Sequence, residues 1–424
     1  MNHSEGQGYS HLYQSVSQRL SDSKVARYTE EAIRDLNYGD VSQTNGLREC
    51  AECHRSEQYV NKDRKCPFCA ALGEISRDIT HKDEFAIVFD SVHDSEYGSL
   101  WLDMPFGYRL AFPAEGRDWR CDNQVVRVYE KNGRKSHDGR SVRIWIADYG
   151  ADMRGFEIAS YESRGTTLQP RKGVARLGAL RADVDNLGST FVCGIPAERL
   201  SFSRSSALSR SLSYFFKVVV NEVLKSGSYQ AQIIYSGGDD LFLIGNWSDV
   251  MYAAIDIRNA LSGYIGSDAI TISAGIGIFD AKYPFARIAT EVGELEDAAK
   301  LFSMTGPNHA ATKNAVSLWR SDNVFSWEEF IKKVTSRKND LERTLFNGEK
   351  GSAFAYKLIK LLREFDEVAS APRLAYMLAR GFENVSDREE DIARMIYKWA
   401  LDANERRCLV AALEWYVYGT RERR

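Results

Sequence analysis

Residues 232–244 read QIIYSGGDDLFLI and contain the pattern that decides the fold. Two short apolar runs, Gln232–Tyr235 and Leu241–Ile244, flank the five residues Ser236–Asp240. Apolar runs of this length, separated by a few Gly, Ser and Asp residues, are typical of two antiparallel strands joined by a tight turn. The turn therefore places its two aspartates together at one end of a β-hairpin.

Strands and helices alternate on both sides of this hairpin. An apolar run predicts a strand from Val174 to Val184. Apolar residues recur at spacings of three and four over residues 204–225, which predicts a helix between this strand and the hairpin. The elements expected after the hairpin are a helix capped by Ser248 that runs to about Tyr264, a strand from Ile270 to Phe279, a helix from about Pro284 to Phe302 and a short strand at Ala315–Leu318. The order βαββαβ, with one additional helix and strand, predicts an α+β fold of the ferredoxin-like palm type.

The segments on either side of the palm have different patterns. We expect three domains: a helical lead-in with a cysteine cluster and a β-rich module at 1–165, the palm at 166–322, and a C-terminal helical bundle at 323–424. The elements expected in the first domain are a helix at about 10–38, short strands at Phe85–Phe89 and Val142–Ile146 with a hairpin turn at Lys131–Gly133 between them, and a linker at 150–173. The features expected in the last domain are a capping box of Ser326 with Glu329 and about four helices, divided by breaks near Gly348, Pro372 and Asn384.

Composition restricts the class of protein. The 424 residues are 44% hydrophobic and include only 8 prolines, which excludes a largely disordered or collagen-like chain. The formal net charge of -3 excludes a wholly basic protein but leaves room for local basic patches. No apolar run reaches about 18 residues, and the first residues lack the basic-then-apolar order of a signal peptide. We therefore expect a folded, cytoplasmic protein that does not enter a membrane.

Four of the seven cysteines, Cys50, Cys53, Cys66 and Cys69, form the pattern C-x2-C-x12-C-x2-C. Two such knuckles deliver four thiolates to one zinc ion and leave no open coordination position, so the zinc is expected to be structural rather than catalytic. The alternative is that these cysteines are free and their spacing is coincidental. The other three cysteines lie far apart in the sequence, which does not fit a disulfide framework.

The aspartates of the turn, Asp239 and Asp240, are the clearest candidates for catalysis. Adjacent carboxylates can hold divalent cations, and Gly237 and Gly238 permit the backbone to approach a nucleotide. Asp183 ends the first palm strand, which pairs with the strand entered from the turn, so three carboxylates are expected to converge. Such a cluster suits two magnesium or manganese ions, which activate a 3′-hydroxyl and stabilise the leaving pyrophosphate of a nucleoside triphosphate. An ordinary acidic hairpin turn is the alternative.

Other residues near these elements are further candidates for the same site. Asp185 is a second carboxylate at the end of the first palm strand and a candidate metal ligand. Lys300 and Lys313 follow the last large strand and are candidates for neutralising a triphosphate, and Ser236 and Ser273 are candidates for contacting the nucleotide. The alternatives are ordinary surface lysines and a strand serine whose hydrogen bonds are satisfied within the protein.

Two His-Asp pairs, His93-Asp94 and His137-Asp138, are reminiscent of a phosphohydrolase metal site. Both pairs lie in strand or turn sequence, without the further His and Asp on helices that such a site needs. We therefore expect no histidine-aspartate nuclease domain in this chain.

Three segments of the palm closely resemble the large Csm-type subunit of type III-A CRISPR effector complexes. They are LRADVDNLG at Leu180–Gly188, YSGGDDLFL at Tyr235–Leu243 and GELEDAAK at Gly293–Lys300. The cysteine ribbon, the stretch Ser23–Tyr28 before it and the helical end also resemble that family. The resemblance therefore covers nearly the whole chain.

The resemblance implies a function. In that family the second palm domain, of the nucleotidyl cyclase type, converts ATP into cyclic oligoadenylates when the complex binds target RNA. Asp239 and Asp240 would then be metal ligands, with Asp183 as the third. The implied partners are the other Csm-type subunits, crRNA and target RNA, with the helical end in contact with the small subunits along the guide-target duplex.

One departure from the family pattern concerns the region before the cysteine ribbon. Family members usually carry a histidine-aspartate nuclease domain and a first palm domain there, and this sequence shows neither. We therefore expect the single-stranded DNA nuclease activity to be absent from this polypeptide, and the second ATP site to come from a partner or a longer chain. A split-gene half and a truncated gene both fit.

Two other functions are alternatives. A diguanylate cyclase has a similar palm, but here the turn continues Asp240-Leu241 rather than Glu-Phe, and the cysteine ribbon and helical end are foreign to that class. A non-catalytic scaffold subunit has no need of clustered carboxylates, which repel one another unless cations are bound.

Overall fold

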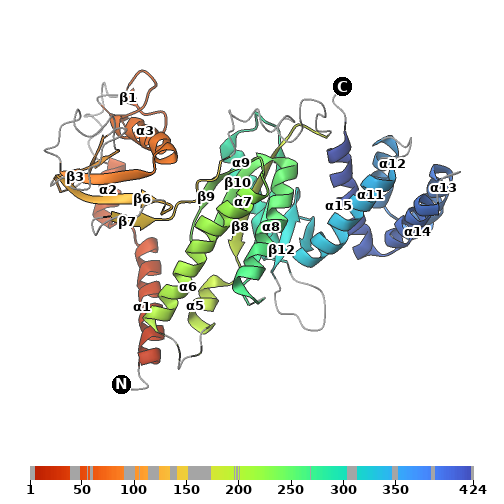
Figure 1. The fold of residues 1–424 in the computed structure, drawn as a ribbon, viewed down its shortest axis with the longest axis horizontal. Helices are drawn as coiled ribbons and strands as arrows, with labels where there is room; N and C mark the ends of the chain where they lie inside the picture. The colour runs from red at the N-terminus through yellow and green to blue at the C-terminus, as the bar shows by residue number, and fades with distance from the viewer. Residues whose placement is uncertain are drawn as a thin grey trace. The chain divides into compact units, whose positions relative to one another are not determined.

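The computed structural model describes most of the chain (Figure 1). The described residues are 5–38, 48–54, 56–57, 61–89, 101–104, 106–112, 124–133, 141–150, 173–194, 196, 199, 201–267, 269–302, 313–345, 352–382 and 387–421. The chain divides into two compact units, one of residues 1–146 with 196–205 and one of residues 147–195 with 206–424. Each unit has a hydrophobic core of its own.

The first unit contains the four cysteines and a five-stranded sheet. Its elements are α1 (Glu5–Val25), α2 (Glu30–Tyr38), β1 (Arg48–Glu49), β2 (Ser56–Glu57), α3 (Pro67–His81), β3 (Glu84–Phe89), β4 (Trp101–Met104), β5 (Tyr108–Ala111), β6 (Val125–Lys131) and β7 (Ser141–Ile144). The strand order of the larger sheet is β4-β5-β3-β6-β7. Residues of β3 alternate between its two faces: Ala86 and Val88 pack with Val128, whereas Phe85 packs with Ile75 of α3.

The prediction of a hairpin turn at Lys131–Gly133 is wrong. Asn132 and Gly133 do form a turn with positive φ, at 56° and 62°. However, β7 pairs with β6 in parallel, with Lys131 opposite Ile144. Parallel strands need a longer crossover, so a two-residue turn cannot join this pair. The strand expected at Phe85–Phe89 is confirmed as β3.

The second unit begins with a six-stranded sheet. Its strands are β8 (Leu177–Val184), β9 (Ala231–Ser236), β10 (Asp240–Asn246), β11 (Ile272–Phe279), β12 (Ala315–Leu318) and β13 (Val324–Ser326), and its helices are α5 (Leu187–Cys193), α6 (Phe202–Tyr214), η4 (Phe215–Val219), α7 (Val220–Ser226), α8 (Trp247–Ile265) and α9 (Phe285–Lys300). The order is β13-β12-β11-β8-β10-β9, with β8 antiparallel to both β10 and β11. The four strands β11-β8-β10-β9 form the expected ferredoxin-like palm, and β12 and β13 extend its edge.

Helices cover both faces of this sheet (Figure 1). On one face, Leu180 and Leu243 belong to the large core that also includes Phe216 and residues of α8. On the other face, α9 packs through Ile288 and Val292 against the alternate residues of the strands. Asp183 and Asp240 have the same strand parity as the residues under α9, so both carboxylates belong to the α9 face.

The C-terminal region is helical, as expected. Its elements are α10 (Trp327–Glu329), η5 (Phe330–Thr335), α11 (Ser336–Leu345), α12 (Ser352–Arg363), α13 (Glu367–Gly381), α14 (Asp387–Leu401) and α15 (Ala403–Thr420). The capping box is confirmed: Ser326 accepts a hydrogen bond from the Glu329 backbone, and Glu329 accepts one from the Ser326 backbone. The helix that starts there is continuous from α10 through α11, so the described residues form five helical segments rather than four.

Two expectations about helix ends are wrong. Asn246, not Ser248, caps α8, because its side-chain oxygen accepts from the backbone N–H groups of Ser248 and Asp249. Pro372 lies inside α13 instead of breaking it. That helix begins after Asp366, whose carboxylate accepts from two backbone N–H groups of the first turn. The strong cap and the buried Leu374 outweigh the hydrogen bond that the proline removes.

The helical region shares one core with the palm. Trp327 is 1% exposed and donates its indole N–H to the Ile272 carbonyl of β11 at 2.7 Å. Phe330 stacks on Trp415 of α15, and Trp415 contacts Tyr252 of α8. Within the described residues, no helix is long and apolar enough to cross a membrane.

We predict that Trp327→Phe destabilises the second unit by about 1–3 kcal/mol, because the buried carbonyl of Ile272 loses its hydrogen-bond donor. Urea unfolding monitored by circular dichroism measures the change. Tyr356→Phe is the control, since Tyr356 is 45% exposed, and its effect should stay within about 0.5 kcal/mol. Equal stability of Trp327→Phe and the wild type would contradict the prediction.

Candidate metal and nucleotide site

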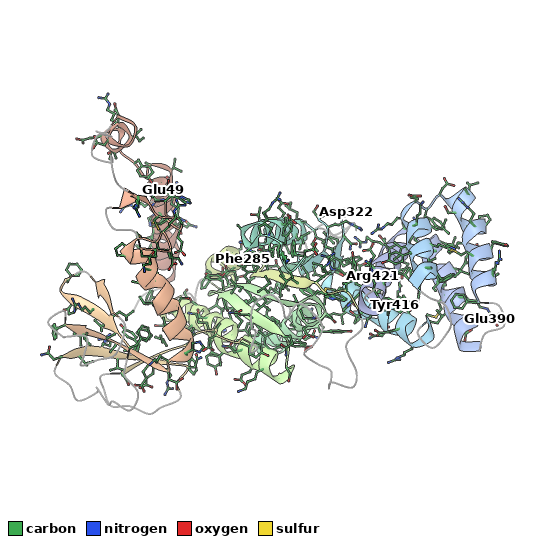
Figure 2. The ribbon with its side chains drawn as sticks, turned by 90° about the horizontal axis from the view of Figure 1, so that it is seen from above. Glu49, Phe285, Asp322, Glu390, Tyr416 and Arg421 are labelled. Carbon is green, nitrogen blue, oxygen red and sulfur yellow. The ribbon has the colours of Figure 1, made fainter. Side chains whose placement is uncertain are left out.

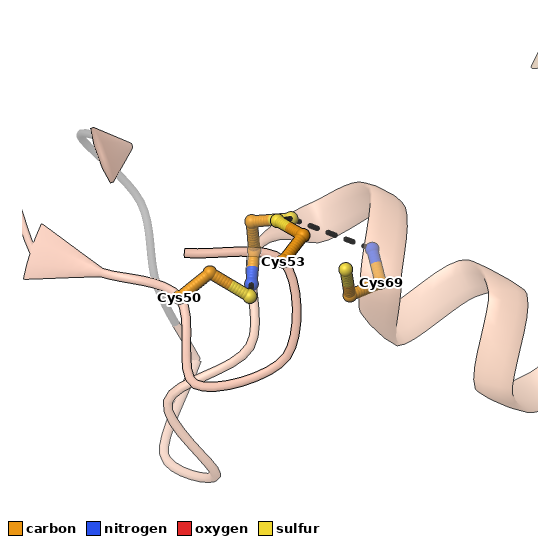
Figure 3. A group of neighbouring side chains, drawn as sticks. Cys50, Cys53 and Cys69 are labelled. Carbon is orange, nitrogen blue, oxygen red and sulfur yellow. Dashed lines mark hydrogen bonds between the residues drawn. The ribbon is translucent and has the colours of Figure 1, made fainter. Parts of the chain in front are cut away.

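The four cysteines gather as the spacing predicts (Figure 3). Their sulfur atoms all lie within 4.8 Å of one another, and Cys50, Cys66 and Cys69 are buried. Among the described residues, these four cysteines are the one group of three or more candidate ligands gathered this closely. Four converging sulfurs are the ligand set of a closed, structural zinc site.

The backbone around the cysteines explains why they converge. β1 and β2 pair across the first knuckle, and the Ala51 N–H donates to the Arg64 carbonyl of the second. The second knuckle is shaped by Asn61, whose side chain accepts from the Asp63 and Lys65 backbone. α3 starts at Pro67 and carries Cys69 in its first turn. Hydrogen bonds within and between the two knuckles therefore hold them in place.

The pKa values of two of the thiols are shifted in opposite directions. Backbone N–H groups of Cys53 and Cys66 lower the pKa of Cys50 to about 6. Burial and hydrogen bonds from the neighbouring cysteines raise the pKa of Cys69 to about 12. Four thiolates at such short separations would repel one another, and a bound cation would balance their charge. The donor set fits zinc.

The carboxylate site is built by strand pairing. Asp240 of β10 lies directly opposite Asp183 of β8. The Val184 N–H donates to the Asp239 carbonyl at 3.0 Å, which makes this the pair type without hydrogen bonds between its own residues, where side chains lie closest. Like charges directly opposite destabilise a sheet. The pairing therefore builds an electrostatic cost into the end of the palm.

A side chain at position 237 would displace neighbouring side chains. A β-carbon there would meet Asp240 Oδ1 at 2.2 Å and the Tyr235 hydroxyl at 2.6 Å. Gly238 differs, because the atom nearest to a β-carbon there would be Ser213 Oγ at 3.6 Å. The first glycine makes room for the carboxylate of Asp240, and the second leaves open space beside the turn.

The charges of the site are reflected in the pKa shifts. Burial and the negative charges of Asp183 and Asp240 raise the pKa of Asp239. The Lys300 ammonium, at the end of α9, is ion-paired with Asp183. Burial lowers the pKa of Lys300, but the hydrogen bonds to Asp183 and Glu296 outweigh it and raise the pKa above its ordinary value. The negative charge of Asp240 raises the pKa of Tyr235, whose side chain is beside it.

Asp185 has a different environment from the other three aspartates. It is 4% exposed, and its Oδ2 accepts from Thr271 Oγ1 at 2.7 Å and from the Asn314 backbone at 2.9 Å. Within the described part of the chain, its Oδ1 has no hydrogen-bond partner. These contacts tie the end of β8 to the starts of β11 and β12, so Asp185 holds the strands that carry the site together.

Comparison with known proteins identifies the fold. Residues 176–315 match the family model described as Cas10/Cmr2, second palm domain, and residues 330–422 match the model of the CRISPR RNA silencing complex Cmr2 subunit, second helical domain. Cas10/Csm1 of subtype III-A from Enterococcus italicus, a protein described as a single-strand-specific deoxyribonuclease, is 36% identical over 422 residues, or 98% of this chain. The chain belongs to the Cas10/Csm1 family.

Other relatives agree. Cas10/Csm1 of subtype III-A from Mycobacterium tuberculosis is 35% identical over 98% of the chain. The chain spans about half the length of these curated relatives, 51% in both cases. The crystal structure of Csm1 in T.onnurineus has a TM-score of 0.57 at 19% identity and covers 86% of this chain and 54% of that one. A Csm1-Csm4 cassette in complex with cA4 has a TM-score of 0.55 at 22% identity and covers 82% and 50%. These two structures support the fold.

The Cas10/Csm1 palm brings together most, but not all, of the residues singled out from the sequence. Lys300 joins Asp183 at the turn, whereas Ser236 faces inward and donates its hydroxyl to the Phe216 carbonyl at 2.8 Å. Ser273 is fully buried and lies beside Asp183 in the strand register. Lys313 is partly buried, in a left-handed conformation with φ of 29°. The two His-Asp pairs of the sequence lie outside the described residues.

Sequence reasoning missed two charged residues of the palm. Glu296 of α9 is buried, and its two oxygens accept from Lys300 Nζ at 2.6 Å and Arg181 Nε at 2.8 Å. The spacing of four between Glu296 and Lys300 on a helix was a usable signal, because such residues are neighbours on the helix surface. Arg181 lies two residues before Asp183 and therefore on the same strand face, which was a second signal.

We predict that Cys50→Ser abolishes zinc binding and loosens the first unit around the knuckles, because a hydroxyl is a poor substitute for a thiolate ligand. Zinc content by atomic absorption and amide hydrogen exchange of residues 48–81 measure the two effects. Cys408→Ala is the control, since Cys408 is buried in α15, outside the cysteine group. Full zinc content in Cys50→Ser would contradict the four-cysteine site.

We predict that Gly237→Ala weakens manganese binding at the palm by roughly 10- to 100-fold, because the new methyl group displaces the Asp240 carboxylate. Isothermal titration calorimetry with Mn²⁺ on zinc-loaded protein measures it. Gly238→Ala is the matched control and should bind Mn²⁺ as the wild type does, since its methyl group enters open space. Equal losses of Mn²⁺ affinity in both variants would contradict the prediction. They would show that the backbone freedom of Gly237, rather than the space it leaves for Asp240, matters for binding.

Proposed function

We propose that this chain is a palm subunit of an RNA-guided type III-A CRISPR effector complex, acting in the cytoplasm. It converts ATP into cyclic oligoadenylates by 3′-5′ nucleotidyl transfer when the complex binds target RNA. The first palm domain, which provides the facing ATP site, comes from a partner or from a longer chain. The observation that carries this proposal is the pairing of Asp183 with Asp240 at the Gly-Gly-Asp-Asp turn, with Lys300 beside them.

The residues at the turn fit this chemistry. Asp183, Asp239 and Asp240 would hold magnesium or manganese, which activates the attacking 3′-hydroxyl and stabilises the leaving pyrophosphate. Lys300 carries the positive charge that binds a triphosphate. Gly238 leaves the backbone open for a nucleotide to approach. The pKa of Asp239, raised by burial and its neighbours, indicates a charge excess that a bound cation relieves.

The comparisons support the proposal. A Csm1-Csm4 cassette has been solved in complex with one ATP and another in complex with cA4, at TM-scores of 0.55 to this chain. We extend ligands of this kind, and assembly with other Csm-type subunits, crRNA and target RNA, to the present chain. The cysteine cluster would hold zinc and stabilise the N-terminal module.

The proposal is tested with an Asp239→Ala, Asp240→Ala double variant. We expect the wild type to convert ATP into cyclic oligoadenylates with Mg²⁺ or Mn²⁺ when the partner subunits, guide and target RNA are present, and the double variant to lose at least about 100-fold in rate. Chromatography of the nucleotide products measures the conversion. Asp322→Asn is the control, because this side chain is 80% exposed.

Three outcomes would contradict the proposal. ATP turnover that survives the double substitution would place catalysis elsewhere. Preference for GTP would favour a diguanylate-cyclase-like enzyme. Absence of product under every condition, with zinc bound and the fold intact, would leave a scaffold role.

A further inference from the structure

Glu296 is a buried carboxylate that the proposed reaction does not use. It lies on α9 and is 3% exposed. Each of its oxygens accepts from one cation: Oε1 from Lys300 Nζ at 2.6 Å and Oε2 from Arg181 Nε at 2.8 Å. An unpaired charge at this depth would be strongly unfavourable. The two cations therefore allow Glu296 to be buried in ionised form.

Lys300 is shared between two carboxylates. Its ammonium carries three N–H donors, and it pairs with both Glu296 and Asp183. The two partners differ in exposure: the side chain of Glu296 is 4% exposed, whereas that of Asp183 is 22% exposed. An incoming cation can therefore reach Asp183 far more easily than Glu296.

The position of Glu296 is fixed by the close approach of α9 to the sheet. A β-carbon on Gly275 of β11 would meet the Glu296 backbone nitrogen at 2.4 Å. A β-carbon on Gly293 of α9 would meet Arg181 Nη1 at 3.1 Å. Two glycines thus let the helix and the strand come together where the ion pairs form. The backbone of Glu296 is therefore held against the sheet, and its side chain is tied to Arg181.

The charges around the turn do not balance. Arg181 and Lys300 supply two positive charges, and the four carboxylates of Glu296, Asp183, Asp239 and Asp240 supply four negative ones. Two formal negative charges are left over, which is the charge that one divalent cation neutralises. Lys300 occupies one of the carboxylates that such a cation needs.

We propose that Glu296 is a positioning residue that holds Lys300 as an exchangeable counterion of Asp183. This inference rests on the proposed function of the palm. Lys300 releases Asp183 when a divalent cation binds there, and Glu296 keeps the ammonium at the edge of the site, where a triphosphate arrives. Without Glu296, Asp183 is the one carboxylate among the described residues that still forms an ion pair with Lys300, so Lys300 competes more strongly with the cation.

The test compares Mn²⁺ binding among variants of the full, zinc-loaded chain by isothermal titration calorimetry, without ATP. Heats measured on the Asp239→Ala, Asp240→Ala variant are subtracted as binding outside the site. We expect Lys300→Met to bind Mn²⁺ about tenfold more tightly than the wild type, and Glu296→Gln about tenfold more weakly. The Glu296→Gln, Lys300→Met variant should bind Mn²⁺ as tightly as Lys300→Met alone, because Glu296 acts through Lys300.

Asp297→Asn is the matched control, because it removes the same charge from the neighbouring, exposed position of α9 and should leave Mn²⁺ binding unchanged. A second measurement is ATP binding in saturating Mn²⁺, which Lys300→Met should weaken about tenfold. A thermal melt of each variant verifies folding. If Glu296→Gln does not fold, Lys300→Met decides alone: Mn²⁺ binding no tighter than in the wild type would overturn the inference.

The outcomes separate this inference from the proposed function. Equal weakening by Glu296→Gln with and without Lys300 would mean that Glu296 acts only through its charge, which overturns the positioning role. Unchanged Mn²⁺ binding in a folded Glu296→Gln variant would overturn it as well. Failure of the wild type to bind Mn²⁺ at all, or equal binding by the Asp239→Ala, Asp240→Ala variant, would instead reject the metal site and with it the proposed function.

Discussion

The antiparallel pairing of β8 with β10 is the constraint on which the rest of the palm depends. It brings together two aspartates that are 57 positions apart in the sequence, Asp183 and Asp240, and sets them directly opposite each other. Sheets avoid such pairs, because like charges at facing positions repel. The surrounding structure accommodates the repulsion instead of removing it: Lys300 pairs with Asp183, and Gly237 leaves the space that the Asp240 carboxylate occupies. A fold that keeps two repelling carboxylates at one end of its central strands is suited to binding cations there.

The second constraint is the distance between α9 and the sheet. Gly275 removes the side chain that would hold the helix away, and Glu296 then becomes buried with Arg181 and Lys300 as its partners. At the other end of the same helix, Phe285, labelled in Figure 2, contacts Phe242 at a ring separation of 5.8 Å. Packing along the whole helix thus determines where its last residue, Lys300, projects. The helix α9 therefore links the packing of the core to the position of the site residue Lys300.

Much of the fold could be predicted from local pattern, and the errors have identifiable physical causes. The hairpin, the palm order and the gathering of the cysteines follow from alternation, turn residues and knuckle spacing, which are all local signals. At Pro372 and Ser248 a neighbouring cap residue, Asp366 or Asn246, determines where the helix begins. At Lys131–Gly133 a contact more distant in sequence determines the outcome, because β6 pairs in parallel with β7. The burial of Glu296 could not be predicted for the same reason, since it depends on the close approach of Gly275 in strand β11. The domain boundaries and the roles of the site residues stay predictions.

The two candidate metal sites differ in a way that matches their proposed roles. The cysteine sulfurs all lie within 4.8 Å of one another, buried on three of four positions, so their ligand cage is formed by the fold itself. The aspartates are not gathered in this way among the described residues, and one of them is paired with a lysine. A closed cage of thiolates suits a zinc ion that stays bound and stabilises its module. Partly exposed carboxylates, one of them paired with the Lys300 ammonium, suit the proposed cations that enter and leave with a nucleotide, because Lys300 balances the charge of Asp183 without closing the site.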